Sequence, residues 1–211
     1  MNITEALPLA EHFLDVLAPT YIRAEIVGSV KRRKTEVHDI EILMIAKPGF
    51  PPPEFGKPKE VYKTHLDKLL AELQRDGVLR TAVNPANGDR LKRREIVGVN
   101  FTGFNLELFI VTPNTWGIQN MIRTGNSWFS HRAVTNRDSI AVDRTRTDRM
   151  AHGFLPNDLR YIKGKDVASG ESCIKRGDEV LSLPEERDVI ELILGKWIEP
   201  ADRSRFADVE K

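Results

Sequence analysis

The chain has 211 residues, of which 40% are hydrophobic and 30% are charged, and its formal net charge is +1. The single Cys173 excludes an internal disulfide, and no apolar run reaches the roughly 20 residues that span a membrane. The N-terminal residues lack the basic and apolar regions of a secretory leader. We therefore expect a cytoplasmic, monomeric protein that has no membrane partner.

Helical and strand-like patterns alternate in the first half of the chain. Apolar residues at helical spacing predict a helix over 3–18, which Thr4 would cap, and an amphipathic helix over 61–76. Between them, "AEIVGSV" predicts a short strand that turns at Gly28, and "DIEILMIA" predicts a strand before the proline-rich loop 47–59. The segments "LRTAVNP", "RLKRREIVGVNF" and "FNLELFIVTP" then predict a meander of strands.

The second half begins with two predicted helices, "TWGIQNMIR" and "SWFSHRAV", separated by a Thr-Gly turn. Few large apolar residues occur over 135–150, so we expect an exposed loop there. Short strands with Gly turns are expected over 153–181. The segment "SLPEERDVIELILGKW" predicts a helix with a capping box made by Ser182 and Glu185, and Gly195 would end it.

Two acidic residues stand in the apolar strand "DIEILMIA". Because alternate side chains of a strand share a face, Asp39 and Glu41 point one way and the apolar residues between and after them the other. Burying two like charges is costly unless a cation compensates them, and carboxylate oxygens suit Mg²⁺. Glu107 stands between two leucines in a second predicted strand. Three carboxylates on two adjacent strands therefore predict a site for one or two Mg²⁺ ions, for which Mn²⁺ would substitute.

A Gly-Ser turn and a basic run precede the first two carboxylates. Gly28 lets the backbone approach a phosphate closely, and Ser29 offers a hydroxyl and an amide. Lys31 and Arg32 follow as charge partners for a triphosphate. Metals together with phosphate-binding groups are what phosphoryl transfer requires.

This arrangement resembles the nucleotidyltransferase superfamily of the DNA polymerase beta type, family X. Further along, "IRTGNSWFSHRAV" resembles the segment of that family in which a Thr-Gly turn opens a helix along the incoming nucleotide. The segment "GFLPNDLRYIKG" is similar to the thumb hairpin of the family, and "LSLPEERDVIELILGKWIEPADRS" to its closing helix and tail. The resemblance covers residues 24–205.

The resemblance implies an α+β fold in two parts. Residues 1–113 would form a nucleotidyltransferase palm with a mixed or antiparallel sheet and flanking helices. Residues 114–211 would form a small α+β thumb that binds the nucleotide. Residues 1–23 leave no room for a lyase or a helix-hairpin-helix domain. The resemblance therefore implies a minimal palm-plus-thumb form of the kind known from viruses, which we would expect in the host cytoplasm.

The implied activity is Mg²⁺-dependent DNA-directed DNA synthesis, with a primer-template and a dNTP as partners and gap-filling repair as the expected role. Asp39 and Glu41 would bind both metals, and Glu107 would bind the catalytic metal and help to deprotonate the primer 3′-hydroxyl. The residues expected to bind the nucleotide are Gly28, Ser29, Lys31, Arg32, Thr124, Gly125, Ser127 and Trp128. The residues expected to bind DNA are Lys92, Arg93, Arg94, His131 and Arg132, for which ordinary solvated faces are the alternative.

Several positions depart from the pattern of the family. The polymerases usually carry Asp where Glu41 and Glu107 stand, often carry Arg where Asn105 stands, and commonly carry an aromatic pair where Ile122 and Arg123 stand. These departures keep open a nucleotidyltransferase that acts without a template on a nucleic-acid end, a small molecule or a protein. A non-catalytic nucleic-acid-binding remnant is the third alternative, which the three retained carboxylates disfavour.

Overall fold

The computed structural model describes residues 1–49, 64–87, 90–99, 103–143, 149–166 and 171–208. The chain divides into two compact units, which are described separately. Unit 1 comprises Met1–Val30 and Lys34–Val111, and unit 2 comprises Lys31–Arg33 and Thr112–Lys211. The main segment of unit 2 thus begins at Thr112, where the sequence predicted a boundary at residue 114. Most of the predicted proline-rich loop lies outside the described residues.

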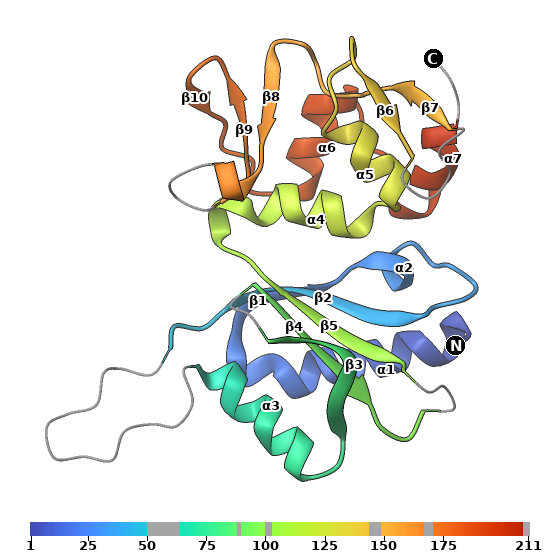
Figure 1. Cartoon of the computed structure of the whole chain (residues 1–211), viewed down its shortest axis with the longest axis vertical. Coiled ribbons are helices and arrows are strands. Elements are labelled where there is room, and N and C mark those ends of the chain that lie inside the picture. The colour runs from blue at the N-terminus through green and yellow to red at the C-terminus, as the bar shows by residue number, and fades with distance from the viewer. Residues whose placement is uncertain (50–63, 88–89, 100–102, 144–148, 167–170, 209–211) are drawn as a thin grey trace, which may run out of the picture. The chain divides into compact units, whose positions relative to one another are not determined.

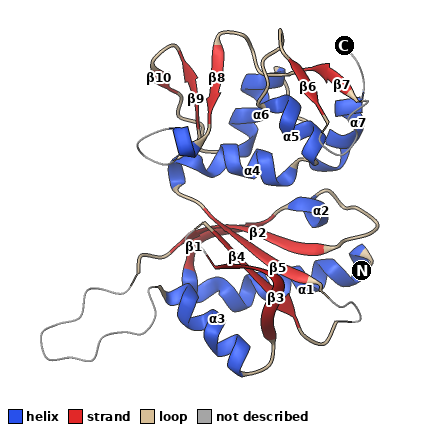
Figure 2. Ribbon diagram, in the orientation of Figure 1, coloured by secondary structure: helices blue, strands red, loops and turns tan. Residues whose placement is uncertain are grey.

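Unit 1 is an α+β unit built on a mixed sheet (Figures 1 and 2). Its five strands lie in the order β1-β2-β5-β4-β3, and only the β2–β5 pair among them is parallel. The strands are β1 (Tyr21–Ile26), β2 (Asp39–Ala46), β3 (Leu79–Asn87), β4 (Leu91–Ile96) and β5 (Asn105–Ile110). The helices are α1 (Ile3–Leu17), η1 (Ala18–Thr20), α2 (Gly28–Lys31) and α3 (His65–Arg75). The expected α+β class with a mixed sheet and flanking helices is confirmed.

The core of unit 1 lies between one face of the sheet and helices α1 and α3. Alternate apolar residues of the central strands, such as Ile40 in β2 and Leu106 in β5, are fully buried against Phe13 of α1 and Leu70 of α3. The strand period of two sends these residues to the helices and their neighbours to the opposite face. The pattern that predicted the strands therefore also fixes which side chains the opposite face carries.

The described part of unit 2 packs four α-helices and three short 3-10 helices with two small sheets around its own core (Figure 1). The helices are η2 (Pro113–Thr115), α4 (Trp116–Thr124), α5 (Ser127–Ala133), η3 (Gly164–Asp166), α6 (Glu186–Leu194), η4 (Pro200–Asp202) and α7 (Arg203–Asp208). The strands are β6 (Ile140–Val142), β7 (Met150–His152), β8 (Leu159–Ile162), β9 (Cys173–Arg176) and β10 (Glu179–Val180). Strands β8, β9 and β10 form one antiparallel sheet, and β6 and β7 form a hairpin.

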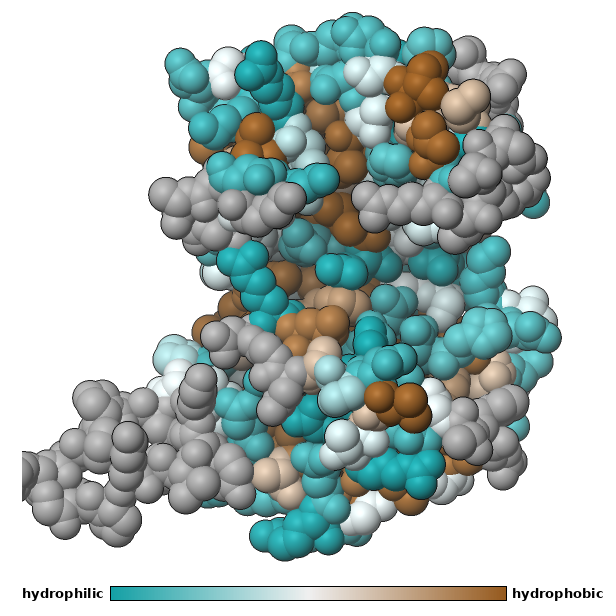
Figure 3. Space-filling model, viewed as in Figure 1, coloured by the Kyte–Doolittle hydropathy of each residue, from teal (hydrophilic) through white to brown (hydrophobic). Residues whose placement is uncertain are grey.

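Part of the loop expected over 135–150 is a strand, because β6 pairs with β7; residues 144–148 lie outside the described ranges. These two strands have three residues each, too few to show a period, and only Ala141 among them is fully buried. Ile140, Val142 and Met150 are exposed, and Figure 3 shows hydrophobic surface over this hairpin. The prediction of a loop was wrong for Ile140–Val142 and Met150, because backbone pairing, rather than burial of a large apolar face, defines these strands.

Two helices begin with caps other than those predicted. Asn2, not Thr4, caps α1, since its side chain accepts from the backbone of Thr4 and Glu5 completes a capping box. Helix α6 begins later than expected, with Glu185 and Asp188 as its capping box. Gly195 ends α6 in the left-handed conformation at φ 72°, as predicted.

Candidate active site

Three acidic residues lie on one face of the unit 1 sheet. In the parallel pairing of β2 with β5, Glu41 is opposite Glu107, and Asp39 is opposite Asn105. Residues paired across adjacent strands point to the same side of the sheet, so all three carboxylates share this face. They are half-buried, whereas their strand neighbours face the helices and are fully buried. The prediction that Asp39, Glu41 and Glu107 share a face is confirmed.

Strand β4 brings Arg93 onto the same face. Arg93 is opposite Glu107 in the antiparallel β4–β5 pairing, and its Nε donates to Glu107 Oε1 at 2.5 Å. Arg93 was predicted to bind DNA phosphates. In the structure its guanidinium is instead the ion-pair partner of a candidate catalytic carboxylate.

The two basic neighbours of Arg93 lie on the opposite face, toward α3. Lys92 is 5% exposed and its Nζ forms an ion pair with Asp67 at 2.7 Å. Arg94 donates to the side chain of Gln74, and burial lowers its pKa from the ordinary value. The prediction that Lys92 and Arg94 bind DNA is corrected, because both side chains are part of the contact between the sheet and the helix.

The turn after β1 passes directly over Glu41. Gly28 adopts φ 68°, and a Cβ at this position would overlap the carboxylate of Glu41. The backbone of Val27 also donates to the carbonyl of Glu41 at 2.9 Å. Both observations give Gly28 a role in packing against Glu41, in addition to the predicted approach to a phosphate.

The oxygen-rich character of this face suits a hard divalent cation. In the described ranges, no group of three His, Cys, Asp or Glu side chains is arranged to hold a metal. Two further oxygens, Ser29 Oγ and Asn105 Oδ1, are buried without a hydrogen-bond partner in the described part of the chain. Hydroxyl, amide and carboxylate oxygens are the kinds of ligand that Mg²⁺ and Mn²⁺ prefer. That the carboxylates converge on a common ion stays a prediction.

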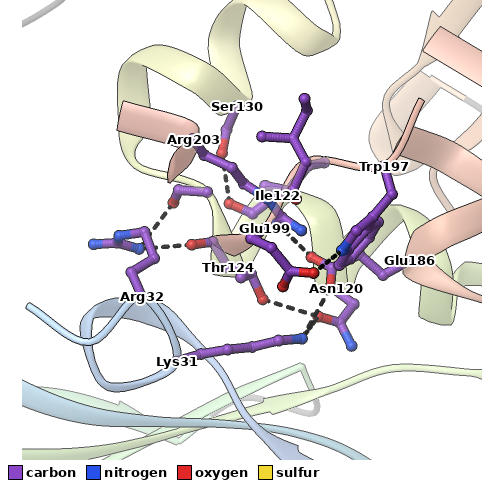
Figure 4. Close-up of polar contacts among 12 residues, drawn as sticks. Lys31, Arg32, Asn120, Ile122, Thr124, Ser130, Glu186, Trp197, Glu199 and Arg203 are labelled. Carbon is purple, nitrogen blue, oxygen red and sulfur yellow. Dashed lines mark hydrogen bonds and ion pairs between the residues drawn. The ribbon is translucent and has the colours of Figure 1, made fainter. Parts of the chain in front are cut away.

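Lys31 and Arg32, predicted to bind phosphates, make polar contacts within unit 2 (Figure 4). Lys31 Nζ contacts Glu186 Oε2 at 2.9 Å and Asn120 Oδ1 at 3.0 Å. Arg32 Nη1 donates to the carbonyl oxygens of Thr124 and Gly125 at 2.8 and 3.1 Å. A phosphate would therefore have to compete with these acceptors for both side chains.

Some of the residues predicted to bind nucleotide line a cavity in unit 2. Its volume is about 260 Å³, and its lining residues are Ile122, Ser127, Trp128, Ser130, His131, Val134, Asp143 and Tyr161. Ser127, Trp128 and the predicted DNA ligand His131 are among them. Thr124 and Gly125, at the end of α4, are buried but do not line the cavity. Tyr161 and Asp143 were not predicted, because nothing in their sequence context links them to this helix.

Arg132, which was predicted to bind DNA, is 3% exposed. Its Nε donates to the carbonyl of His152 at 2.8 Å, and its Nη1 donates to the carbonyl of Ala207 at 2.7 Å. Arg132 therefore links α5 to β7 and to α7 by hydrogen bonds, and the prediction that it binds DNA is corrected.

Asn105 is a residue that the carboxylate pattern missed. It lies two residues before Glu107 in β5, which places it on the same face of the sheet.

No protein-family model matches the chain, and no curated protein matches it. None of the helices in the described ranges has the length and hydropathy needed to cross a membrane.

Proposed function

We propose that the protein is a Mg²⁺-dependent nucleotidyltransferase of the DNA polymerase beta type, with unit 1 as its palm and unit 2 as its thumb. The observation that carries this proposal is the pairing of Glu41 with Glu107 across parallel strands, with Asp39 on the same face. Carboxylates placed on the rigid central strands of a sheet can hold cations in a fixed arrangement. The proposed reaction adds a dNMP to a primer 3′-hydroxyl.

In this reaction the 3′-hydroxyl oxygen bonds to the α-phosphorus, the bond to the β-phosphate breaks, and pyrophosphate leaves. Asp39 and Glu41 would hold two Mg²⁺ ions, which when bound supply Lewis-acid stabilisation of the phosphate oxygens. Glu107 would contribute to the same donor set and accept the proton of the hydroxyl. Ser29 supports the assignment, because its buried Oγ has no hydrogen-bond partner within the described ranges.

A template-independent nucleotidyltransferase is the second candidate. It is favoured by Ile122, an aliphatic residue in the wall of the unit 2 cavity, where family X polymerases commonly carry an aromatic residue. The same carboxylates would serve this reaction, so the two candidates differ in their acceptor rather than in their chemistry.

Primer extension distinguishes the two candidates. Purified protein and Mg²⁺ are incubated with each dNTP and rNTP on a one-nucleotide gap and on the corresponding single-stranded primer, with Asp39→Ala as the control. The proposal predicts templated addition in the gap that is lost in Asp39→Ala. Addition regardless of template would support the second candidate. No addition to either acceptor, in the presence of measurable Mg²⁺ and nucleotide binding, would contradict a polymerase.

A further inference from the structure

The side chain of Arg93 is held at two points. Its Nε donates to Glu107 Oε1 at 2.5 Å, and its Nη1 donates to the backbone carbonyl of Asn84 at 3.1 Å. The Arg93 side chain is 27% exposed and that of Glu107 is 12% exposed, so water screens this ion pair only in part. Among the described residues, Arg93 is the ion-pair partner that the structure gives to Glu107.

An irregularity in β3 provides the second of these two acceptors. The β3–β4 register jumps from Thr81 opposite Arg94 to Ala86 opposite Arg93, so residues 82–85 bulge out of the pairing. Asn84 lies in this bulge, and its carbonyl accepts a hydrogen bond from the Arg93 side chain. Bulges re-aim groups next to functional sites. The sheet is thus built to fix the guanidinium of Arg93 beside Glu107.

We infer that Arg93 is a positioning residue for the proposed transfer reaction, and that it acts through Glu107. By occupying Oε1, Arg93 orients the carboxylate so that its second oxygen serves the reacting groups. This inference rests on the proposed function. It replaces the earlier prediction that Arg93 contacts DNA, since both acceptors of its guanidinium belong to the sheet.

The positive charge of Arg93 also sets how strongly the face attracts cations. A guanidinium bound to a carboxylate repels a divalent ion at the same site, by an amount that depends on screening. Arg93 therefore weakens cation binding while it improves the geometry of Glu107. Removing Arg93 should change the rate and the cation affinity in opposite directions, which loss of a merely structural residue would not do.

The test compares Arg93→Ala and Arg93→Lys with wild type in full-length protein. The inference predicts that kcat falls about 10- to 100-fold in Arg93→Ala with little change in KM for dNTP. Mn²⁺ binding, followed by the EPR signal of free Mn²⁺, should tighten about three- to tenfold in the same variant. Arg93→Lys keeps the charge but not the two-point contact, so it should keep the Mn²⁺ affinity of wild type and have an intermediate kcat.

Arg176→Ala is the matched control. It removes the same charge from strand β9, where Arg176 pairs with Asp158 at 3.0 Å rather than with a group on the acidic face. We expect Arg176→Ala to match wild type in kcat and Mn²⁺ affinity. Thermal unfolding of each variant, followed by circular dichroism, shows whether the fold is retained.

The outcomes separate this inference from the proposed function. Should wild type transfer no nucleotide, the proposed function fails, but tighter Mn²⁺ binding by Arg93→Ala would still support the charge and contact assigned to Arg93. Weaker or unchanged Mn²⁺ binding by Arg93→Ala overturns the inference while leaving the activity of wild type intact. A loss of affinity for gapped DNA, with a salt slope reduced by about one, would restore the DNA-binding role. Absence of Mn²⁺ binding by every variant overturns both.

Discussion

Glu41 and Glu107 lie opposite each other in the parallel pair of β2 and β5, on the face of the sheet opposite helices α1 and α3. Two like charges at paired positions destabilise a sheet unless a cation lies near them. Arg93 supplies one positive charge at Glu107, while Asp39 adds a third negative charge to the same face. Three carboxylates on one face are the reason that a divalent ion is the expected ligand.

Gly28 is predicted to be required for the position of the Glu41 carboxylate. In Gly28→Ala the new Cβ would overlap this carboxylate and displace it. We expect Mn²⁺ affinity and nucleotide transfer to fall about 10-fold or more, as for other residues that orient metal ligands. The left-handed backbone adds a stability cost of about 1 kcal/mol. Mn²⁺ titration and the transfer assay measure the effect.

Gly77→Ala is the control for this prediction. Gly77 has a similar φ of 74°, but a Cβ there would meet no atom within 4 Å. It should therefore cost a similar amount of stability and leave Mn²⁺ affinity unchanged. Equal Mn²⁺ affinities in both variants would show that Gly28 has no role beyond its backbone conformation.

Glu186 is predicted to be the main electrostatic anchor within unit 2. It accepts from Arg203, which is fully buried, and from Lys31 at 2.9 Å (Figure 4). Glu186→Ala would leave the buried guanidinium without this counter-charge, which should destabilise the fold by about 3–5 kcal/mol. Urea unfolding measures this. A loss below about 1 kcal/mol would mean that other groups compensate Arg203.

The ion pair of Asp67 with Lys92 should make stability depend on pH. Burial raises the pKa of Asp67, but hydrogen bonds from Lys92 and Thr64 outweigh it and hold this pKa below the ordinary value of 3.8. The ion pair therefore stabilises the fold at pH values above the pKa of Asp67 in the unfolded chain. This stabilisation is lost as the pH falls through the pKa of Asp67 in the folded protein. Asp67→Asn should cost about 2 kcal/mol at pH 7.

Unfolding of wild type and Asp67→Asn between pH 7 and pH 3 checks this prediction. The difference in free energy of unfolding should shrink as the pH falls below about 4. A difference that stays constant over this range would mean that the charge of Asp67 is not what stabilises the contact.

Strand alternation predicts the acidic face, and the same alternation places the basic residues of β4 on two different faces. Asp39, Glu41 and Glu107 share a face because they alternate with Ile40, Ile42, Leu106 and Leu108, which belong to the core. Lys92 and Arg94 point to α3, and Arg93 to the acidic face, so three consecutive cations cannot form one DNA-binding surface. Alternation within β4 was the signal that could have separated them.

Other features depend on pairings that sequence patterns do not contain. The β3 bulge that directs the Asn84 carbonyl to Arg93 follows from a register between distant segments. The burial of Arg132 depends on carbonyls of His152 and Ala207, which are remote in the chain. Such contacts are set by tertiary packing, and composition near the residue gives no indication of them.

The most direct test of the central claim is Mg²⁺-dependent release of pyrophosphate during incorporation of a radiolabelled dNMP into gapped DNA. Wild type is compared with Asp39→Asn, Glu41→Gln and Glu107→Gln, which keep the shape of each side chain and remove its charge. We predict incorporation by wild type and a loss of about 1,000-fold or more in each variant, with unchanged thermal unfolding. Incorporation that survives in folded Glu41→Gln and Glu107→Gln would contradict the claim that the paired carboxylates of β2 and β5 carry the reaction.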